Sequence, residues 1–557
     1  MGLSFLGARE TGQRQLIYLA YGIVALLCLL FSFRYFIASG FDRLAGDDGD
    51  AKLIMAQLEH WRAVLAGRAW YDSPIWFYPV KHILGIQDGL LLNGLTHSAA
   101  RLVFDEHASL EVGAMLASLI GFAGTALLLH RGLRMSVWVA LWGAAFFVIQ
   151  GSLYRMHHAP QMATVFYFPL LGFLLLASLT HRETRLHAFA LPAAALLFVA
   201  MWWSTFYVAW YATLFLILLA LICLTIALYR AGWRTSLQAS LAFAKERRCE
   251  IAGGAVPLVI GGIAFTSLYL PHLRRQGGWP YQVIDERLLH VTDLVVATPD
   301  NWLWGYAVGG GDPPDVFGFP PLFGLLCFAG VVWCTIRVLQ RSRPLNVLEL
   351  YCCATGIAAF LLWFCFLKIG DWTIYKYVYR YVPGAAAMRV PVRLNLFLAA
   401  VLAPIVVIVI QAIWNAGRGK PAVRALAVAI ACLAFAEQGT SREVSYWSRK
   451  KDRALLASIP APPGYCRSFF VSWTIPRPWD GPLLQYFYAP ISDGMLLASR
   501  FRVPTLNGLG TAADDGWPAP PPMGDKYEET IGRWVYQHKL QRVCRLVLPT
   551  GSWHFYR

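Results

Sequence analysis

The feature that most limits the fold of this chain is a series of long apolar runs. Segments of roughly 18 or more residues that carry almost no charge recur along it, and each is long enough to cross a hydrocarbon layer about 30 Å thick. Only 14% of the 557 residues are charged, against about 25% in an average soluble protein. The sequence therefore predicts a polytopic α-helical membrane protein with about 11 transmembrane helices. The expected spans are 16–38, 109–130, 136–150, 162–180, 188–204, 207–229, 251–270, 320–338, 346–367, 394–414 and 423–437.

The basic excess of the chain, a formal net charge of +16, is explained by membrane topology. Lys and Arg are retained on the cytoplasmic side of membrane proteins. If the N-terminus is cytoplasmic, every inner loop is basic and almost free of acid, as in 230–248. We therefore expect no nucleic-acid partner. We also expect the first apolar run to be a retained signal anchor, because it exceeds the apolar stretch of a cleaved signal peptide.

An odd number of spans divides the chain into two expected domains, with the C-terminal one outside. The first is a transmembrane domain at 1–437, and the second is a small α/β domain at 438–557. The long outer loops of the transmembrane domain are 39–108, 271–318 and 368–393.

The outer C-terminal domain contains recognisable strand and helix patterns. "CRSFFVSW" and "RVCRLVLP" have the composition of strands, and "KYEETIGRWVYQHKL" has the periodicity of a helix. Its cysteines are Cys466 and Cys544. In an oxidising compartment these two either form a disulfide or remain free thiols.

An unusual concentration of acid follows the first apolar run, in "FDRLAGDDGDAKL" at 41–53. Its members are Asp42, Asp47, Asp48 and Asp50. One interpretation is structural: Asp50 is the N-cap of an amphipathic helix that lies at the membrane surface. The other is functional, because the glycines at 46 and 49 let the backbone bring several carboxylates to one ligand. Such carboxylates suit a divalent cation or a general base.

A pair of arginines stands near the outer end of a late span, in "AMRVPVRLNL". Arg389 and Arg393 are four residues apart, so a helix end would present both guanidiniums on one face. They either bind a phosphate or diphosphate, with Arg274 and Arg275 as helpers, or anchor the chain at the membrane surface.

Two further outer stretches carry polar candidates. In "LYRMHHAPQMA", His158 and Gln161 either bind an anionic or hydroxylated ligand or belong to a plain interfacial turn. In "SPIWFYPVKHILGIQDGLL", Tyr78 and Asp88 either line an acceptor groove or form a turn at the membrane surface.

Together these motifs resemble the GT-C superfamily of membrane glycosyltransferases, and more narrowly a group of bacterial GT-C-type proteins. The resemblance is carried by "GDDGDAKL", "WFYPVKHILGIQDGLL", "HHAPQ", "MRVPVRL" and "PTLNGLG". It implies a multi-pass enzyme of the bacterial inner membrane, with the C-terminal domain periplasmic. Such an enzyme transfers a sugar from a polyprenyl-phosphate-linked donor to a glycan, lipid or protein acceptor on the outer face.

The resemblance also implies roles for particular residues. The catalytic base is a first-loop carboxylate, which maps onto Asp47 or Asp50, with Asp48 as a substrate-binding neighbour. Where the common motif has proline, this chain has Asp48, so the identity of the base stays open. Asn507 of "PTLNGLG" is expected to bind the acceptor. Some relatives hold a divalent metal such as Mg²⁺ or Mn²⁺, for which Asp47 and Asp50 are the candidate ligands, and others hold none.

Two other functions fit the same pattern. One is a transporter or flippase for lipid-linked saccharides. Transporters tend to show internal repeats and ionisable residues at the membrane midplane, and here the charges lie at span ends with no visible repeat. The other is a non-catalytic binding scaffold, because a fold does not fix a function.

Overall fold

The computed structural model describes residues 3–46, 49–151, 153, 160–180, 185–294, 301–305, 318–440, 446–473, 483–509 and 525–557. Within these residues, 8 helices are long and apolar enough to cross a membrane, judged by length and composition. They are Gln15–Ser32, Glu106–Gly132, Pro160–Leu179, Phe206–Ala231, Arg248–Arg275, Pro321–Leu339, Val347–Cys365 and Pro391–Ala416. Shorter apolar helices at Val137–Val148, Ala188–Trp202 and Pro421–Ala436 coincide with the other expected spans. The chain is a polytopic α-helical membrane protein, as predicted, and the total of eleven spans stays a prediction.

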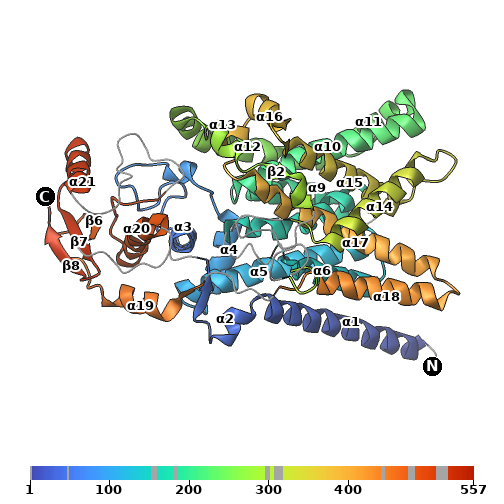
Figure 1. Ribbon diagram of the computed structural model, residues 1–557, viewed down its shortest axis with the longest axis horizontal. Helices are drawn as coiled ribbons and strands as arrows, with labels where there is room; N and C mark the ends of the chain where they lie inside the picture. Colours follow the sequence, from blue (N-terminus) through green and yellow to red (C-terminus); the bar gives the residue numbers. More distant parts are fainter. Residues whose placement is uncertain are drawn as a thin grey trace.

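The helical bundle and a second body of helices and strands lie at opposite ends of the molecule (Figure 1), and we call the second the outer body after its predicted side of the membrane. The longer helices of the bundle are α1 (Leu3–Ser32), α5 (Glu106–Leu127), α6 (Val137–Val148), α8 (Phe168–Thr180), α9 (Arg185–Trp202), α10 (Phe206–Ala231), α12 (Arg248–Gln276), α14 (Pro321–Leu339), α15 (Val347–Cys365), α17 (Leu394–Ala416) and α18 (Pro421–Ala436). Its other segments are η2 (Leu128–Gly132), η4 (Pro160–Tyr167) and α11 (Trp233–Glu246).

The outer parts of the chain contain shorter elements. Between the first two spans lie α2 (Arg34–Ala38), β1 (Arg43–Ala45), α3 (Asp50–Leu65), η1 (Ile83–Ile86) and α4 (Leu91–Ala100). The later outer loops hold α13 (Tyr281–Asp285), β2 (Leu289–His290), η5 (Val291–Leu294), β3 (Leu367–Ile369), β4 (Trp372–Thr373), α16 (Tyr375–Tyr381), η6 (Ala385–Ala387) and η7 (Pro391–Arg393). The C-terminal part holds β5 (Tyr446–Ser448), α19 (Arg449–Ser458), β6 (Ser468–Trp473), α20 (Leu483–Phe501), α21 (Asp525–Gln537), β7 (Val543–Leu548) and β8 (Ser552–Phe555).

Helix α17 is the centre of the bundle. Its sequence is apolar on every side, and nearly all of its residues from Leu394 to Val409 are buried. A helix that is hydrophobic all round must be covered on all faces, and α6, α14, α15 and α18 pack against it. The arginines at 389 and 393 immediately precede this buried helix.

The outer body has its own apolar core, and two distant parts of the chain build it together. Ile54 and Trp76 of the first outer loop share this core with Phe470 and Leu497 of the C-terminal part. Strands β1 and β5 also pair across these parts, antiparallel, with Leu44 opposite Trp447. The division into domains at 437 and 438 stays a prediction.

Helix α3 differs from the amphipathic surface helix that the sequence predicts. Its apolar residues are buried, as an amphipathic helix requires, but Lys52, Gln57 and His60 on its other sides are buried too. The reason is that α20 packs along α3 and covers sides that the periodicity alone assigns to solvent. The expected N-cap also shifts by one residue, since the helix begins at Asp50 and Gly49 takes the N-cap position.

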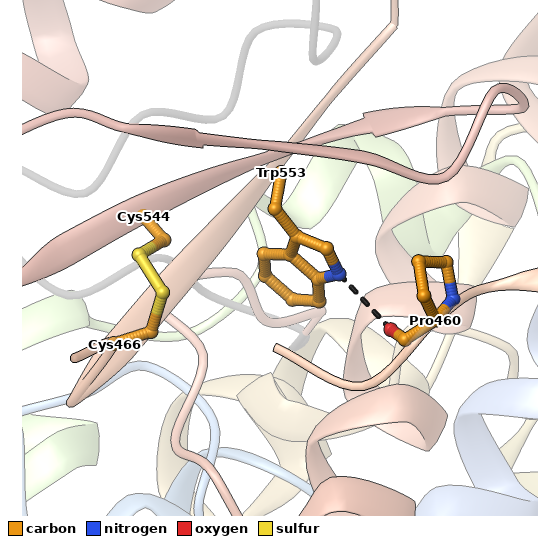
Figure 2. The surroundings of a disulfide bond; sticks show 4 residues. All are labelled: Pro460, Cys466, Cys544 and Trp553. Atoms are coloured by element: carbon orange, nitrogen blue, oxygen red, sulfur yellow. Dashed lines mark hydrogen bonds between the residues drawn. A yellow bond between two sulfur atoms is a disulfide. The ribbon is translucent and has the colours of Figure 1, made fainter. Parts of the chain in front are cut away.

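The C-terminal strands and helix lie where the sequence predicts them. Strand β6 pairs in parallel with β7, and β8 adds to β7 antiparallel. A disulfide joins Cys466 to Cys544 beside this sheet (Figure 2). Nearby, the Trp553 indole N–H donates to the carbonyl of Pro460 at 3.0 Å. The disulfide alternative is therefore confirmed.

Candidate functional site

The site is assembled around the first turn of α10, on the side of the bundle that faces the outer body. Tyr207 and Trp210 are three residues apart and therefore lie on one face of that helix. The Trp210 indole N–H donates to the carbonyl of Pro383 at 2.9 Å, and the Val390 N–H donates to the Tyr207 hydroxyl at 3.1 Å. These bonds fix the segment that leads into α17.

The two arginines of that segment each lie over an aromatic ring. The guanidinium carbon of Arg389 is 5.0 Å from the ring centre of Trp279, and that of Arg393 is 5.4 Å from the ring centre of Tyr207. Stacking of this kind orients a guanidinium plane. Both arginines act electrostatically on Tyr207, so they converge on one place.

This convergence does not come from the helix that the sequence predicts. Arg389 lies outside any helix. Arg393 is the last residue of the short 3-10 segment η7, and α17 begins at Leu394. The proline at 391 explains the difference, because proline restricts the preceding residue to extended conformations. Trp279 and Tyr207, which lie on other elements, orient the two side chains.

Asp88 belongs to the same place. Its carboxylate accepts a hydrogen bond from the N–H of Phe206, the first residue of α10, at 2.9 Å. Burial raises the pKa of the Asp88 carboxyl to about 6, while the Phe206 N–H and the Arg393 guanidinium act in the opposite direction. Asp88 and Arg393 therefore lie close enough to act on each other electrostatically.

Gln161 reaches the same helix end from η4. Its carbonyl accepts hydrogen bonds from the hydroxyls of Thr205, the residue before α10, and of Thr164 at 3.3 Å. Its side-chain oxygen is buried and has no hydrogen-bond partner in the part of the chain that the structure describes. The structure thus brings Asp88, Gln161, Arg389 and Arg393 to one helix end. His158 lies outside the described residues, and its role stays a prediction.

The acidic segment of the first outer loop is held at both ends. On one side, the Ala45 N–H donates to a carboxylate oxygen of Glu111 at 2.7 Å, and Glu111 is buried at the start of α5. On the other side, the Ser492 hydroxyl of α20 donates to the Gly49 carbonyl at 3.0 Å. The C-terminal part of the chain therefore holds the acidic segment directly.

The aspartates of this segment differ in what surrounds them. Asp47 and Asp48 lie outside the described residues. Asp50 is exposed at the first position of α3. Asp42 accepts the Lys450 N–H at 2.7 Å and the Ser448 hydroxyl at 3.2 Å, so it ties the loop to β5 and α19. The catalytic and ligand roles of Asp47, Asp48 and Asp50 remain predictions.

Helix α3 links the acidic segment to the arginine site. The Gln57 amide of α3 bonds the side chain of Gln87 and also lies 3.5 Å from the carbonyl oxygen of Asp88. Gln57 follows Asp50 by seven residues, which is an axial rise of about 10 Å along a helix. The first-loop carboxylates and the arginine site are thus joined by two turns of one buried helix.

A buried ionic cluster fastens α3 to the C-terminal part. Lys52, only 1% exposed, makes ion pairs with Asp452 of α19 and with Asp493 of α20, the latter at 2.7 Å. His107 of α5 bonds the other oxygen of Asp452 at 2.7 Å. Burial opposes ionisation of Asp452, but Lys52 and His107 hold the pKa of its carboxyl below the usual value.

Tyr78 and Asn507 lie together at the contact between the first loop and the C-terminal sheet. The Tyr78 carbonyl accepts the Trp534 indole N–H at 3.0 Å, and its side chain is exposed. Asn507 is buried, and its side chain accepts the Val471 N–H at 2.6 Å and donates to Tyr527 at 2.8 Å. These bonds give Asn507 a structural task, and substrate binding by either residue stays a prediction.

The loop that carries Asn507 nevertheless approaches the arginine site. The Gln87 amide donates to the carbonyl of Leu509, and Gln87 directly precedes Asp88. The "PTLNGLG" segment therefore faces the bundle, next to the residue that caps α10.

No group of three or more His, Cys, Asp or Glu side chains in the described ranges is arranged to hold a metal ion. Asp47 and Asp48 lie outside those ranges. Within the described ranges the residues therefore offer no built cation site, and a metal at the first loop stays a prediction.

Sequence reasoning missed several residues of the site. Tyr207 lies inside a long apolar span, where a tyrosine is not conspicuous. Trp279 stands in an outer loop whose tryptophans fit an interfacial belt. Lys52 stands within "GDDGDAKL", but on a side of α3 that periodicity assigns to solvent, so the sequence carries no signal for its buried ion pairs.

Comparison with known proteins identifies structures with a similar fold but no related sequence. No protein-family model matches the sequence, and no curated protein matches it. Among solved structures, the chain is similar to the oligosaccharyltransferase of Archaeoglobus fulgidus in its apo form. That match has a TM-score of 0.50 and 15% sequence identity, and it covers 94% of this chain and 69% of the other. ArnT from Cupriavidus metallidurans bound to undecaprenyl phosphate matches with a TM-score of 0.40, 14% identity and coverage of 96% and 90%.

The first of these likenesses, together with the apolar helices, defines the class of the molecule. The chain is a polytopic membrane protein with the fold of that oligosaccharyltransferase, so the fold implied by the resemblance to the GT-C superfamily is confirmed. At 15% identity the likeness concerns the fold alone.

Proposed function

We propose that this protein is a GT-C-type glycosyltransferase that takes a sugar from a polyprenyl-phosphate-linked donor. The acceptor, a glycan, lipid or protein, is glycosylated on the periplasmic face of the bacterial inner membrane. The observation that carries the proposal is the convergence of Arg389, Arg393 and Asp88 at the outer end of α10, in a chain with the fold of an oligosaccharyltransferase.

The arginines have the chemistry that a lipid phosphate requires. Arg389 and Arg393 are partly buried and oriented by aromatic rings, and guanidinium forks match phosphate oxygens. They stand where a span meets the outer surface, so a lipid tail can remain between helices while the phosphate reaches them. In the transition state they stabilise the charge that develops on the leaving phosphate.

A first-loop carboxylate supplies the base. Asp47 or Asp50 accepts the proton of the acceptor hydroxyl as its oxygen attacks C1 of the donor sugar. The bond between C1 and the phosphate oxygen breaks, and the phosphate leaves with the bonding electrons. If a divalent cation takes part, Asp47 and Asp50 are its candidate ligands, and it would supply further charge stabilisation for the phosphate.

The base is tested by Asp47→Asn and Asp50→Asn in the full-length protein, reconstituted with a polyprenyl-phosphate sugar and scored for sugar transfer. At least one variant should lose transfer at normal expression. Asp371→Asn, in an exposed turn between β3 and β4, is the matched control and should keep full activity. Full activity in both first-loop variants would refute the proposed base.

The phosphate site is tested by replacing both arginines with Gln. Binding of the lipid donor should weaken at least tenfold, which is about 1.4 kcal/mol. Arg380→Gln, an exposed arginine of α16, is the control. Unchanged donor affinity would return the two arginines to the role of membrane anchors. If the protein moves the lipid donor from one leaflet of a vesicle membrane to the other and transfers no sugar, the result would favour a flippase.

A further inference from the structure

Helix α11 lies on the membrane face opposite the candidate site. It is joined to two spans with a single residue on each side, since α10 ends at Ala231, α11 runs Trp233–Glu246 and α12 begins at Arg248. Helix α10 starts at the site, where Asp88 bonds the N–H of Phe206, and then crosses the bundle. Because each linker is one residue long, α11 must lie at the same membrane depth as the C-terminal end of α10 and the N-terminal end of α12.

One face of α11 is apolar and exposed. Trp233, Leu237 and Leu241 follow one another at intervals of four residues, which places them in one stripe. Their side chains are 64%, 51% and 61% exposed. An amphipathic helix held at the end of two spans rests with such a stripe in the lipid interface.

Basic residues accompany this stripe. Arg234, Lys245 and Arg248 are exposed, and the acidic neighbours in the same stretch are Glu246 and Glu250. The guanidinium carbon of Arg234 lies 5.4 Å from the ring centre of Trp233. The positive charge of Arg234 therefore lies at the same membrane depth as the Trp233 ring.

Arg247 is different, because it is buried. The residue is 4% exposed and stands at the joint between α11 and α12. Its Nη1 donates to the carbonyl of Ser178 in the last turn of α8, and its guanidinium carbon lies 4.7 Å from the ring centre of Phe243. Its Nη2 has no hydrogen-bond partner in the part of the chain that the structure describes.

A buried guanidinium N–H that finds no acceptor among the described residues favours an added one, and a phosphate oxygen fits its geometry and charge. We propose that α11 and Arg247 form a binding site for the phosphate headgroup of an anionic phospholipid, in the leaflet opposite the candidate site. The apolar stripe lies among the acyl chains, Arg247 Nη2 donates to a phosphate oxygen, and Lys245 and Arg248 add positive charge. A phospholipid fits better than a soluble anion, because the same helix presents three large apolar side chains.

The test counts lipids that remain bound to the intact protein in native mass spectrometry, after exchange into detergent with dioleoylphosphatidylglycerol or dioleoylphosphatidylcholine. The native protein should retain phosphatidylglycerol in preference to phosphatidylcholine. Arg247→Gln should weaken that retention about fivefold, close to 1 kcal/mol for one basic side chain at an anionic surface. The triple variant Arg234→Gln, Lys245→Gln, Arg248→Gln, which keeps Arg247, should weaken retention of phosphatidylglycerol more than Arg247→Gln does.

The control is Arg418→Gln with Lys420→Gln, which removes two exposed charges from the loop between α17 and α18 on the same membrane face. It should retain phosphatidylglycerol as the native protein does. The triple variant alters only exposed side chains, so it should fold. Its retention of phosphatidylglycerol therefore tests the proposal even if Arg247→Gln fails to fold. Equal retention of both lipids by all variants would overturn the proposal. Displacement of phosphatidylglycerol by inorganic phosphate would show a soluble-anion site instead.

Discussion

Removal of the Lys52 charge should loosen the outer body from the first outer loop. In Lys52→Met, the carboxylates of Asp452 and Asp493 stay buried, at 6% and 1% exposed, but lose the cation between them. Breaking a buried ion pair by removing one partner costs about 3–5 kcal/mol. Asp452 keeps His107, so we expect a loss near the lower end of that range.

Hydrogen exchange of the full-length protein in lipid nanodiscs measures this loss locally. A reduction of about 3 kcal/mol in the free energy of local opening corresponds to exchange faster by about two orders of magnitude. The acceleration should appear in α3, α19 and α20 and not in the bundle core around α17. Exchange in these helices that changes less than fivefold would contradict the reasoning.

A compensating variant separates charge from packing. Lys52→Met combined with Asp452→Asn and Asp493→Asn removes the cation and both anions, and neutral replacement of a buried cluster is often tolerated. It should therefore recover most of the lost protection. The native cluster should also respond to acid with a defined sign. Because the pKa of Asp452 is lowered in the folded state, its contribution is present above about pH 4 and is lost as the pH falls below that value.

Three more predictions concern other described contacts. The pKa of Asp88 is raised to about 6, so its ionisation costs stability as the pH rises from about 4 to 6. Asp88→Asn should raise the melting temperature at pH 8 and leave it nearly unchanged at pH 4. Cys466→Ala with Cys544→Ala opens a cross-link that spans 78 residues and should cost the outer body up to about 4.5 kcal/mol, measured by limited proteolysis against the native protein with its disulfide intact. Glu437, which accepts the N–H groups of Leu322 and Phe323 at 2.6 and 2.8 Å, caps α14. Glu437→Ala should lower thermal stability by more than about 2 kcal/mol and Glu437→Gln by less, and equal loss in the two would argue against capping.

The spans and the C-terminal strands were predictable because local physics fixes them. The bilayer imposes length and apolarity on every span, so hydropathy locates helices such as α17 without knowledge of their neighbours. Strands β6 and β7 are short runs rich in apolar, aromatic and β-branched residues, which favour strands wherever they are buried. Arg389 and Arg393 could be selected because arginines at an outer span end run against the positive-inside tendency, and Asp88 because it follows the α3 segment in a long loop.

Their arrangement could not be predicted, because it depends on distant contacts. The sequence implied that a helix would align Arg389 with Arg393, whereas Trp279 and Tyr207 orient them from other elements. The burial of Lys52 depends on Asp493, and nothing near either residue in the sequence indicates the other. Periodicity in α3 likewise shows which face is apolar and not that α20 covers the rest.

The shared outer core has a consequence for how the protein is made. Strand β1 pairs with β5, and Lys52 needs Asp493, so the first outer loop emerges from synthesis long before the residues that complete it. Translation of the roughly 500 intervening and following residues, at about 5–20 residues per second, takes on the order of half a minute to two minutes. During that interval the loop has an open strand edge and a lysine that lacks Asp452 and Asp493. Biogenesis of the outer body is therefore coupled to insertion of the last span, and a ribosome that stops before α20 leaves the acidic segment unsupported.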